Sequence, residues 1–160
     1  MRLPIFLFAF LLAASCAFAQ ESLNNLPLPR WATLATPEAN LRTGPGKRYP
    51  IDWVLKKQRL PVEITQEFDN WRRIREPGGS DGWIHRSMLS GVRHAMLKQD
   101  GTMFSQPNGD SRVLAKLQKG VIATLSQCQK DWCRLKVDQY DGWVRKKSLW
   151  GVYPDEVWKN

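Results

Sequence analysis

Cysteine and histidine are scarce in this chain of 160 residues, which contains three cysteines and two histidines. Two of the cysteines, Cys128 and Cys133, lie close together, whereas His85 and His94 are distant from them in the sequence. A structural zinc site takes about four ligands, and these residues do not form a recognisable ligand set. The sequence therefore predicts no metal centre and no other cofactor.

The chain also lacks an apolar run long enough to span a bilayer. Its longest run, residues 3–14, falls short of the roughly 20 residues that a transmembrane helix needs. The run follows Arg2 and leads to the Ala-x-Ala spacing that a signal peptidase accepts. We expect residues 1–19 to be a signal peptide, cleaved between Ala19 and Gln20, and the mature protein to be periplasmic or secreted with no stable membrane span.

Cys16 offers an alternative form of export. Residues 12–16 resemble a lipoprotein processing box, in which the cysteine becomes a lipidated N-terminus. Ala13 stands where that box usually has leucine. Lipidation at Cys16 therefore stays open as the second interpretation of the leader.

Acidic residues are outnumbered, because 24 lysines and arginines face 15 aspartates and glutamates, for a formal charge of +9. In a cytoplasmic protein this excess would suggest nucleic acid. Export instead favours anionic envelope material, such as the carboxylates of cell-wall peptides or the phosphates of lipid headgroups, or an acidic protein. We expect no nucleic-acid partner. A charge that serves only solubility is the alternative.

The two neighbouring cysteines are expected to form a disulfide. An oxidising compartment favours pairing of Cys128 with Cys133 once the leader is removed. A two-residue turn at Lys130 and Asp131 would place these cysteines directly opposite each other, where disulfide geometry is attainable. We therefore expect a structural bond rather than a redox or metal site.

The most informative feature is an internal repeat. Asp81–Ile84 recurs sixty residues later as Asp141–Val144, and Leu89–Val92 recurs at the same offset as Leu149–Val152. The segment at Trp71 matches the segment at Trp132 at an offset of sixty-one. The repeat predicts two units, residues 35–93 and 94–153, with a linker at 20–34 and a C-terminal tail at 154–160.

Each unit has the pattern of a small β-barrel. Apolar residues come in short stretches with strand-like alternation, separated by turn residues, and no convincing helical stripe appears. A unit of about sixty residues made of short antiparallel strands needs a closed or nearly closed barrel, since an open sheet would leave exposed edges and too little core.

Several motifs of the first unit resemble a bacterial SH3 (SH3b) domain. They are Asn-Leu-Arg-x-Gly-Pro-Gly at residues 40–46, Trp-x-x-Ile at Trp71, Gly-Trp-Ile at Gly82 and the serine-leucine turn at residues 87–89. The order Cys128, Trp132, Cys133 and the ending at residues 149–154 further resemble the tandem SH3-like proteins of Gram-negative, especially alphaproteobacterial, cell envelopes. The second unit departs from the first signature, with Met103, Phe104 and Gln106 in its place.

This resemblance implies an all-β fold of two tandem small SH3-like barrels after a cleaved signal peptide. It implies five strands in each barrel. It also implies attachment or targeting, commonly to cell-wall or protein ligands, without catalysis.

Alternation along the strands suggests where a ligand binds. Trp71, Arg73 and Arg75 share one face of their strand, and Trp132 and Arg134 share the corresponding face in the second unit. If the opposite faces line the cores, each outer face can stack on a sugar or peptide and pair with carboxylates. In the alternative, each tryptophan covers a barrel end and the basic residues are merely solvated.

The long loop at residues 43–58 adds two further ligand-binding candidates, Tyr49 and Trp53. Aromatic residues on loops often take part in binding. The alternative is that both side chains pin the loop to the barrel.

The sequence predicts that the protein is not an enzyme. The two paired cysteines leave no free thiol, and about thirty residues outside the barrels are too few for a catalytic domain. We expect an exported, non-catalytic binding module that recognises a cell-envelope ligand, peptidoglycan or its peptides. The alternative is a protein–protein interaction adaptor or an accessory subunit of a periplasmic complex.

Overall fold

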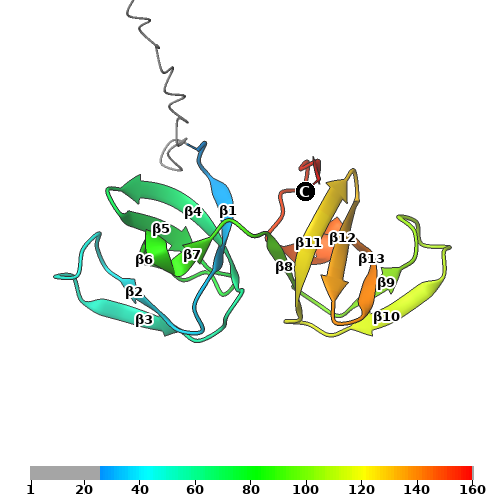
Figure 1. The fold of residues 1–160 in the computed structure, drawn as a ribbon, viewed down its shortest axis with the longest axis horizontal. Helices are drawn as coiled ribbons and strands as arrows, with labels where there is room; N and C mark the ends of the chain where they lie inside the picture. The colour runs from blue at the N-terminus through cyan, green and yellow to red at the C-terminus, as the bar shows by residue number, and fades with distance from the viewer. Residues whose placement is uncertain (1–25, 160) are drawn as a thin grey trace, which may run out of the picture.

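The computed structural model describes residues 26–159, which form two curled antiparallel sheets, each around its own apolar core (Figure 1). The predicted cleavage site at Ala19 and Gln20 and the alternative lipidation site at Cys16 lie outside the described residues. Within the described part of the chain, no helix is both long and apolar enough to cross a membrane.

The first sheet has seven strands in the order β3-β2-β6-β5-β4-β1-β7. A single 3₁₀ turn, η2 (Arg86–Met88), lies between β6 and β7. The strands are β1 (Arg30–Leu34), β2 (Ala39–Arg42), β3 (Ile51–Leu55), β4 (Pro61–Phe68), β5 (Trp71–Arg75), β6 (Asp81–His85) and β7 (Leu89–Ser90).

The second sheet has eight strands, seven of which follow the order β10-β9-β13-β12-β11-β8-β14, while the eighth, β15, pairs with β11. A second 3₁₀ turn, η3 (Lys146–Ser148), precedes β14. The strands are β8 (His94–Leu97), β9 (Gly101–Phe104), β10 (Val113–Leu117), β11 (Ile122–Gln129), β12 (Trp132–Val137), β13 (Tyr140–Arg145), β14 (Leu149–Trp150) and β15 (Trp158–Lys159).

The two sheets repeat one topology strand by strand. Each strand of the first order is matched by the strand seven labels later in the second. Even the irregularities agree, because β4 has a register shift between Ile64 and Gln66 and β11 has one between Leu125 and Gln127. The predicted all-β fold with two tandem small barrels is confirmed.

The sheets extend beyond the units predicted from the repeat. Arg30–Leu34, expected in the linker, forms β1 and pairs with both β4 and β7, burying Ala32 and Leu34. Trp158–Lys159, expected in the tail, pairs with β11. Unpaired strand edges attract further strands, so both flanking segments complete the sheets, and the five strands expected in each barrel become seven or eight.

The repeated Asp-Gly-Trp motif has a steric cause. A Cβ atom at Gly82 would lie 2.7 Å from the Leu41 side chain and 2.9 Å from the carbonyl oxygen of Arg42. At Gly142 it would lie 2.6 Å from Met103. Glycine therefore lets β6 and β13 pass close to β2 and β9, which is why the motif occurs in both units.

The predicted disulfide is confirmed. Cys128 and Cys133 are bonded, with their Cα atoms 4.1 Å apart, and they face each other across the β11–β12 hairpin. Gln129 lies opposite Trp132, as the two-residue turn requires. Both cysteines are buried in the second core.

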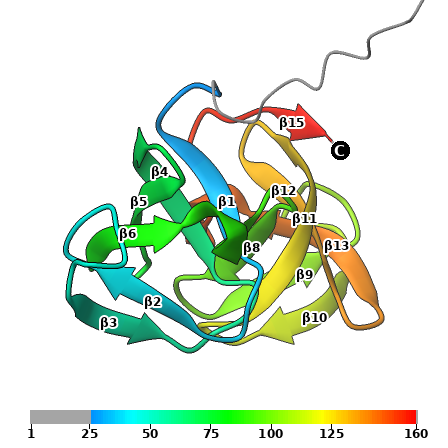
Figure 2. The ribbon, with the colours of Figure 1, turned by 60° about the vertical axis from the view of Figure 1, so that its left-hand side comes forward.

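The two barrels are joined by direct side-chain contacts. The Trp150 Nε1 donates to the Pro61 carbonyl oxygen at 2.8 Å, and the Tyr153 hydroxyl donates to Glu63 Oε1 at 3.0 Å. The Trp31 ring meets the rings of both Trp150 and Tyr153. Figure 1 shows β1, in blue, and the segment after β14, in red, on the sides of the two barrels that face each other, and Figure 2 shows the molecule turned by 60°. The chain therefore holds its barrels against each other rather than on a free linker.

Candidate functional site: an open groove and its closed counterpart

The first barrel has a groove of about 480 Å³ where β2, the loop after it, and the ends of β5 and β6 meet η2. Its walls combine an aromatic ring, an imidazole, two basic side chains and a carboxylate. The lining residues are Glu38, Ala39, Asn40, Arg42, Lys47, Trp71, His85, Ser87 and Met88.

Trp71 and His85 form the aromatic wall of this groove. They lie opposite each other on β5 and β6, and their rings meet edge to face with centroids 5.4 Å apart. The His85 Nδ1 accepts a hydrogen bond of 3.3 Å from the backbone N–H of Ser87. In neutral His85 the proton therefore sits on Nε2, where it is a donor. The half-buried Trp71 offers an aromatic face for stacking.

Arg42 organises the loop that borders the groove. Its guanidinium donates to the carbonyl oxygens of Tyr49 at 2.8 Å and Lys47 at 3.3 Å. The Tyr49 ring packs on Gly44, where a Cβ atom would lie 2.4 Å from the ring, and the Arg48 guanidinium lies 5.1 Å from its centroid. Tyr49 is thus held within the loop and does not line the groove, whereas Lys47 does.

Trp53, the other aromatic candidate of this region, lies on the edge strand β3 with 60% of its surface exposed. It does not line the groove either. The structure therefore separates Trp53 from Trp71, and the two do not form one aromatic surface.

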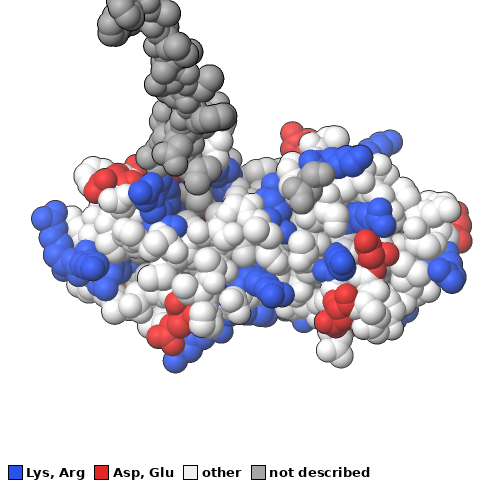
Figure 3. All heavy atoms as spheres, in the orientation of Figure 1, with Lys and Arg blue, Asp and Glu red and all other residues white. Residues whose placement is uncertain are grey.

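The predicted basic rows are present but compensated. Arg73 pairs with Asp81, Arg75 pairs with Glu63, and in the second barrel Arg134 pairs with Asp141 at 2.7 Å. Figure 3 shows, on the face it displays, basic and acidic side chains interspersed over both barrels. Alternation placed these arginines on the outer face correctly, yet their charges face aspartate and glutamate, and none of the three lines the groove.

The second barrel closes the equivalent position. Phe104 pairs with Trp143 where Arg42 pairs with Trp83 in the first barrel, and its ring packs edge to face on Trp132 at 5.6 Å. Arg145, at the place of His85, lies over the Trp132 ring at 4.1 Å. Trp132 is consequently only 6% exposed. The copies have diverged into one open and one filled site.

His85, Asn40 and Lys47 line the groove but are not among the site residues predicted from the sequence. The position of Phe104 opposite Arg42 was visible in the repeat, but its meaning depends on where the ring packs. Trp83 lies opposite Arg73 on the neighbouring strand and is half-buried, but it does not line the groove.

The described residues contain no group of three or more histidine, cysteine, aspartate or glutamate side chains arranged to hold a metal ion.

The sequence pattern of the bacterial SH3 domain matches residues 35–91 and 98–151, which is more than half of the chain. The chain belongs to the bacterial SH3 domain family. The first matched segment contains β2 to β7 and the second contains β9 to β14, so the resemblance to a bacterial SH3 domain and the tandem arrangement predicted from the repeat are both confirmed.

One curated relative of this bacterial SH3 protein is YrvJ from Bacillus subtilis (strain 168), which carries the provisional name of an N-acetylmuramoyl-L-alanine amidase. The two are 28% identical over a segment that covers 74% of this chain and 25% of YrvJ. The chain thus spans about a quarter of that relative.

Among solved structures, NlpC2 from Trichomonas vaginalis matches with 15% identity and a TM-score of 0.36, covering 79% of this chain and 49% of NlpC2. An NlpC/P60 family protein from Bacillus cereus ATCC 10987 matches with 12% identity and a TM-score of 0.34, covering 74% and 55%. Scores this low support no structural or functional argument.

The prediction that the protein is not an enzyme is contradicted by the comparison with YrvJ, whose name is that of an amidase. That prediction rested on the absence of a free thiol in the two paired cysteines and on the few residues left outside the two barrels. A count within a chain that spans a quarter of its relative says nothing about catalysis by the whole protein, and we withdraw the prediction.

Proposed function

We propose that the first barrel binds a glycan-peptide of the bacterial cell wall in the groove between Trp71, His85 and the loop at Lys47. The observation that carries the proposal is that Trp71 lines an open groove beside groups of both charges, in a barrel whose counterpart has filled the same position. The YrvJ name supports the choice of ligand, because an N-acetylmuramoyl-L-alanine amidase is named for a bond of cell-wall material.

The groove suits the chemistry of such a ligand. Sugar rings and peptide planes pack well on an exposed indole face. The Lys47 ammonium can pair with a peptide carboxylate, and Glu38 with an amine. Lys47 forms no ion pair with a described carboxylate, whereas the pair between Glu38 and Lys56 is long, at 3.8 Å, and exposed. Exposed pairs of this kind contribute little and are readily exchanged for a ligand.

Binding and hydrolysis are compatible roles in this proposal. A barrel that holds cell-wall material keeps a scissile bond near any catalytic group that acts with it. Such a ligand also agrees with the expected location in the cell envelope, periplasmic or secreted, which remains part of the proposal.

The experiment is co-sedimentation with purified insoluble peptidoglycan. We expect wild-type protein to sediment with the wall material, and sedimentation to weaken as salt screens the Lys47 contribution. Trp71→Ala should weaken the apparent affinity for the wall material about fivefold or more, since the loss of an aromatic platform typically costs about 1–3 kcal/mol of stacking energy. Trp53→Ala removes an exposed tryptophan outside the groove and serves as the matched control.

Equal sedimentation of the Trp71→Ala and Trp53→Ala variants would contradict the groove assignment. Absence of wild-type sedimentation would favour a protein partner in the envelope, the adaptor role that the sequence left open. Circular dichroism of both variants shows whether the fold is retained.

A further inference from the structure

The second barrel has a pocket of about 540 Å³ that is separate from the groove of the first barrel. It lies between η3, the turn before β12 and the segment that follows β14. Its lining residues are Lys98, Lys130, Asp131, Arg145, Lys146, Lys147, Leu149, Val152 and Pro154.

The charge of this pocket is unbalanced. Five of the lining residues are cationic, and Asp131 is the one carboxylate among them. No described carboxylate forms an ion pair with any of the five, unlike Arg73, Arg75 and Arg134 on the sheet surfaces. Like charges gathered at this density repel each other, and a bound anion relieves the repulsion.

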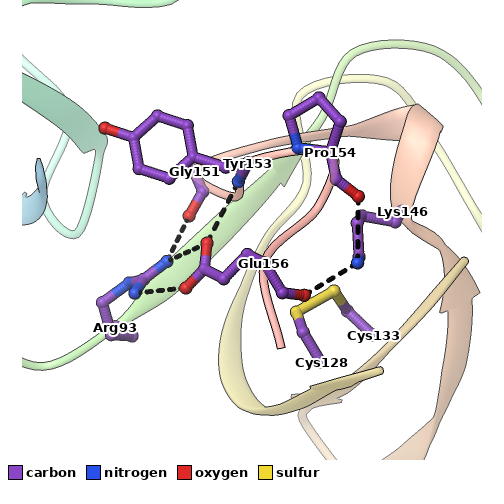
Figure 4. The surroundings of a disulfide bond; sticks show 8 residues. All are labelled: Arg93, Cys128, Cys133, Lys146, Gly151, Tyr153, Pro154 and Glu156. Carbon is purple, nitrogen blue, oxygen red and sulfur yellow. Dashed lines mark hydrogen bonds and ion pairs between the residues drawn. A yellow bond between two sulfur atoms is a disulfide. The ribbon is translucent and has the colours of Figure 1, made fainter. Parts of the chain in front are cut away.

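Lys146 gives the strongest indication of a missing counter-charge. Its residue is 4% exposed, and its ammonium donates to the carbonyl oxygens of Pro154 at 3.1 Å and Glu156 at 2.8 Å (Figure 4). The Glu156 carboxylate is turned to Arg93 instead. An ammonium has three donors, and a buried charge without an opposite charge is costly. An anion in the pocket would meet both needs.

The repeat shows that these charges are specific to the second barrel. Matching backbone hydrogen bonds define equivalent positions: Lys98 N–H to Ser148 corresponds to Ala35 N–H to Met88, and Lys146 N–H to Asp131 corresponds to Arg86 N–H to Asn70. The six charged pocket positions of the second barrel thus correspond in the first to Ala35, Asp69, Asn70, His85, Arg86 and Ser87. These positions carry five cations and one carboxylate in the second barrel, but only one cation, Arg86, and one carboxylate, Asp69, in the first.

We propose that this pocket binds a phosphate-bearing organic ligand. A phosphate monoester carries about −1.5 to −2 charges, so one group neutralises more of the cluster than one carboxylate does. Lysine ammonium groups bind phosphate as point charges. Leu149, Val152 and Pro154 provide an apolar wall for the carbon skeleton. The phosphate can belong to a lipid headgroup or to a soluble phosphosugar, and the chemistry of recognition is the same.

The test measures pyrophosphate binding by isothermal titration calorimetry at low salt. The double variant K98A/K147A removes two exposed cations of the pocket and leaves Lys146 in place. The control K119A/K136A removes two exposed lysines outside the pocket and matches the change in net charge. We expect the pocket variant to weaken binding about tenfold or more, because charge-assisted contacts are lost, and the control to weaken it about twofold at most.

Equal weakening by the two double variants, or no binding of pyrophosphate to the wild type, would overturn the proposal. Two further ligands identify the source of the phosphate. Phosphatidylcholine vesicles with and without phosphatidic acid represent a headgroup, and a soluble hexose phosphate represents a free sugar. If binding of either ligand is weaker in K98A/K147A than in the wild type, the result supports the proposal.

This inference stands apart from the proposed cell-wall groove. The K98A/K147A variant should still sediment with peptidoglycan through Trp71. The Trp71→Ala variant should still bind pyrophosphate. Failure of one site therefore leaves the other measurable.

Discussion

The indole Nε1 of Trp150 donates a hydrogen bond of 2.8 Å to the carbonyl oxygen of Pro61. The bond joins β14 of the second barrel to the start of β4 in the first. The Trp150 ring also meets Trp31 edge to face at 5.0 Å. The first copy has Ser90 at the place of Trp150, so the junction uses a side chain that only the second copy carries.

We expect Trp150→Phe to lower the free energy of unfolding by about 1–2 kcal/mol, because the Pro61 carbonyl loses its indole donor while most of the ring packing remains. Urea unfolding measures this change. Trp53→Phe, at an exposed site, is the control and should change stability by less than about 0.5 kcal/mol. Equal stabilities of the two variants would show that the junction contributes nothing.

Because the site of the second barrel is filled, we expect Trp132 to contribute more to stability than Trp71 does. Trp132 is buried under Phe104 and Arg145, so Trp132→Ala should cost about 3–5 kcal/mol of stability. Trp71→Ala, at a half-buried position, should cost clearly less. Thermal unfolding of both variants provides the comparison, and a Trp71→Ala cost as large as that of Trp132→Ala would argue for a structural role of Trp71.

The disulfide closes a small loop, so its loss should lower stability only modestly, by about 2 kcal/mol. Urea unfolding with and without reductant tests the magnitude. Peptide mass spectrometry after alkylation tests the bond itself. The protein is alkylated in urea without reductant, so that buried thiols become accessible. Alkylation of Cys128 and Cys133 in this sample would be incompatible with the pairing.

His94 should make stability depend on pH. Burial, reinforced by the positive charge of Arg59, lowers the pKa of His94 below its ordinary value of 6.5, against the opposing hydrogen bond to Val92. The unfolded chain therefore binds the proton more readily than the folded one. Stability is fully present above pH 6.5 and falls as the pH drops, until folded His94 is protonated as well.

Urea unfolding across this pH range, compared between wild type and His94→Gln, checks the effect. The wild type should lose stability on acidification more steeply than the variant. Parallel curves for the two proteins would exclude His94 as the responsible group.

Much of the fold could be predicted from the sequence, because the repeated residues are determined by contacts with chain neighbours or with one paired strand. Gly82 and Gly142 are demanded by a close strand crossing, and the register at Cys128 and Cys133 follows from a two-residue turn. Alternation along β5 placed Trp71 and Arg73 on the outer face correctly. These features depend on neighbours in the chain or on one paired strand.

The rest depended on packing between distant segments. The segment that forms β1 lies between Pro29 and Pro37, residues typical of linkers, and it becomes a strand because it can pair with β4. The diagonal pairing of Arg73 with Asp81 neutralises a side chain that looked free for a ligand. Phe104 closes its groove only because β9 brings it onto Trp132. In each of these three cases, the sequence pattern of the segment itself does not indicate which distant segment it contacts.

The central claim is that the first barrel binds cell-wall material through Trp71 while the second has closed that position. The most direct measurement is a ¹H–¹⁵N spectrum of the tryptophan indole groups during titration with a soluble muropeptide. We predict that the Trp71 indole signal shifts and that the Trp132 signal stays in place. A shift of Trp132 without Trp71, or no shift of either, would contradict the account.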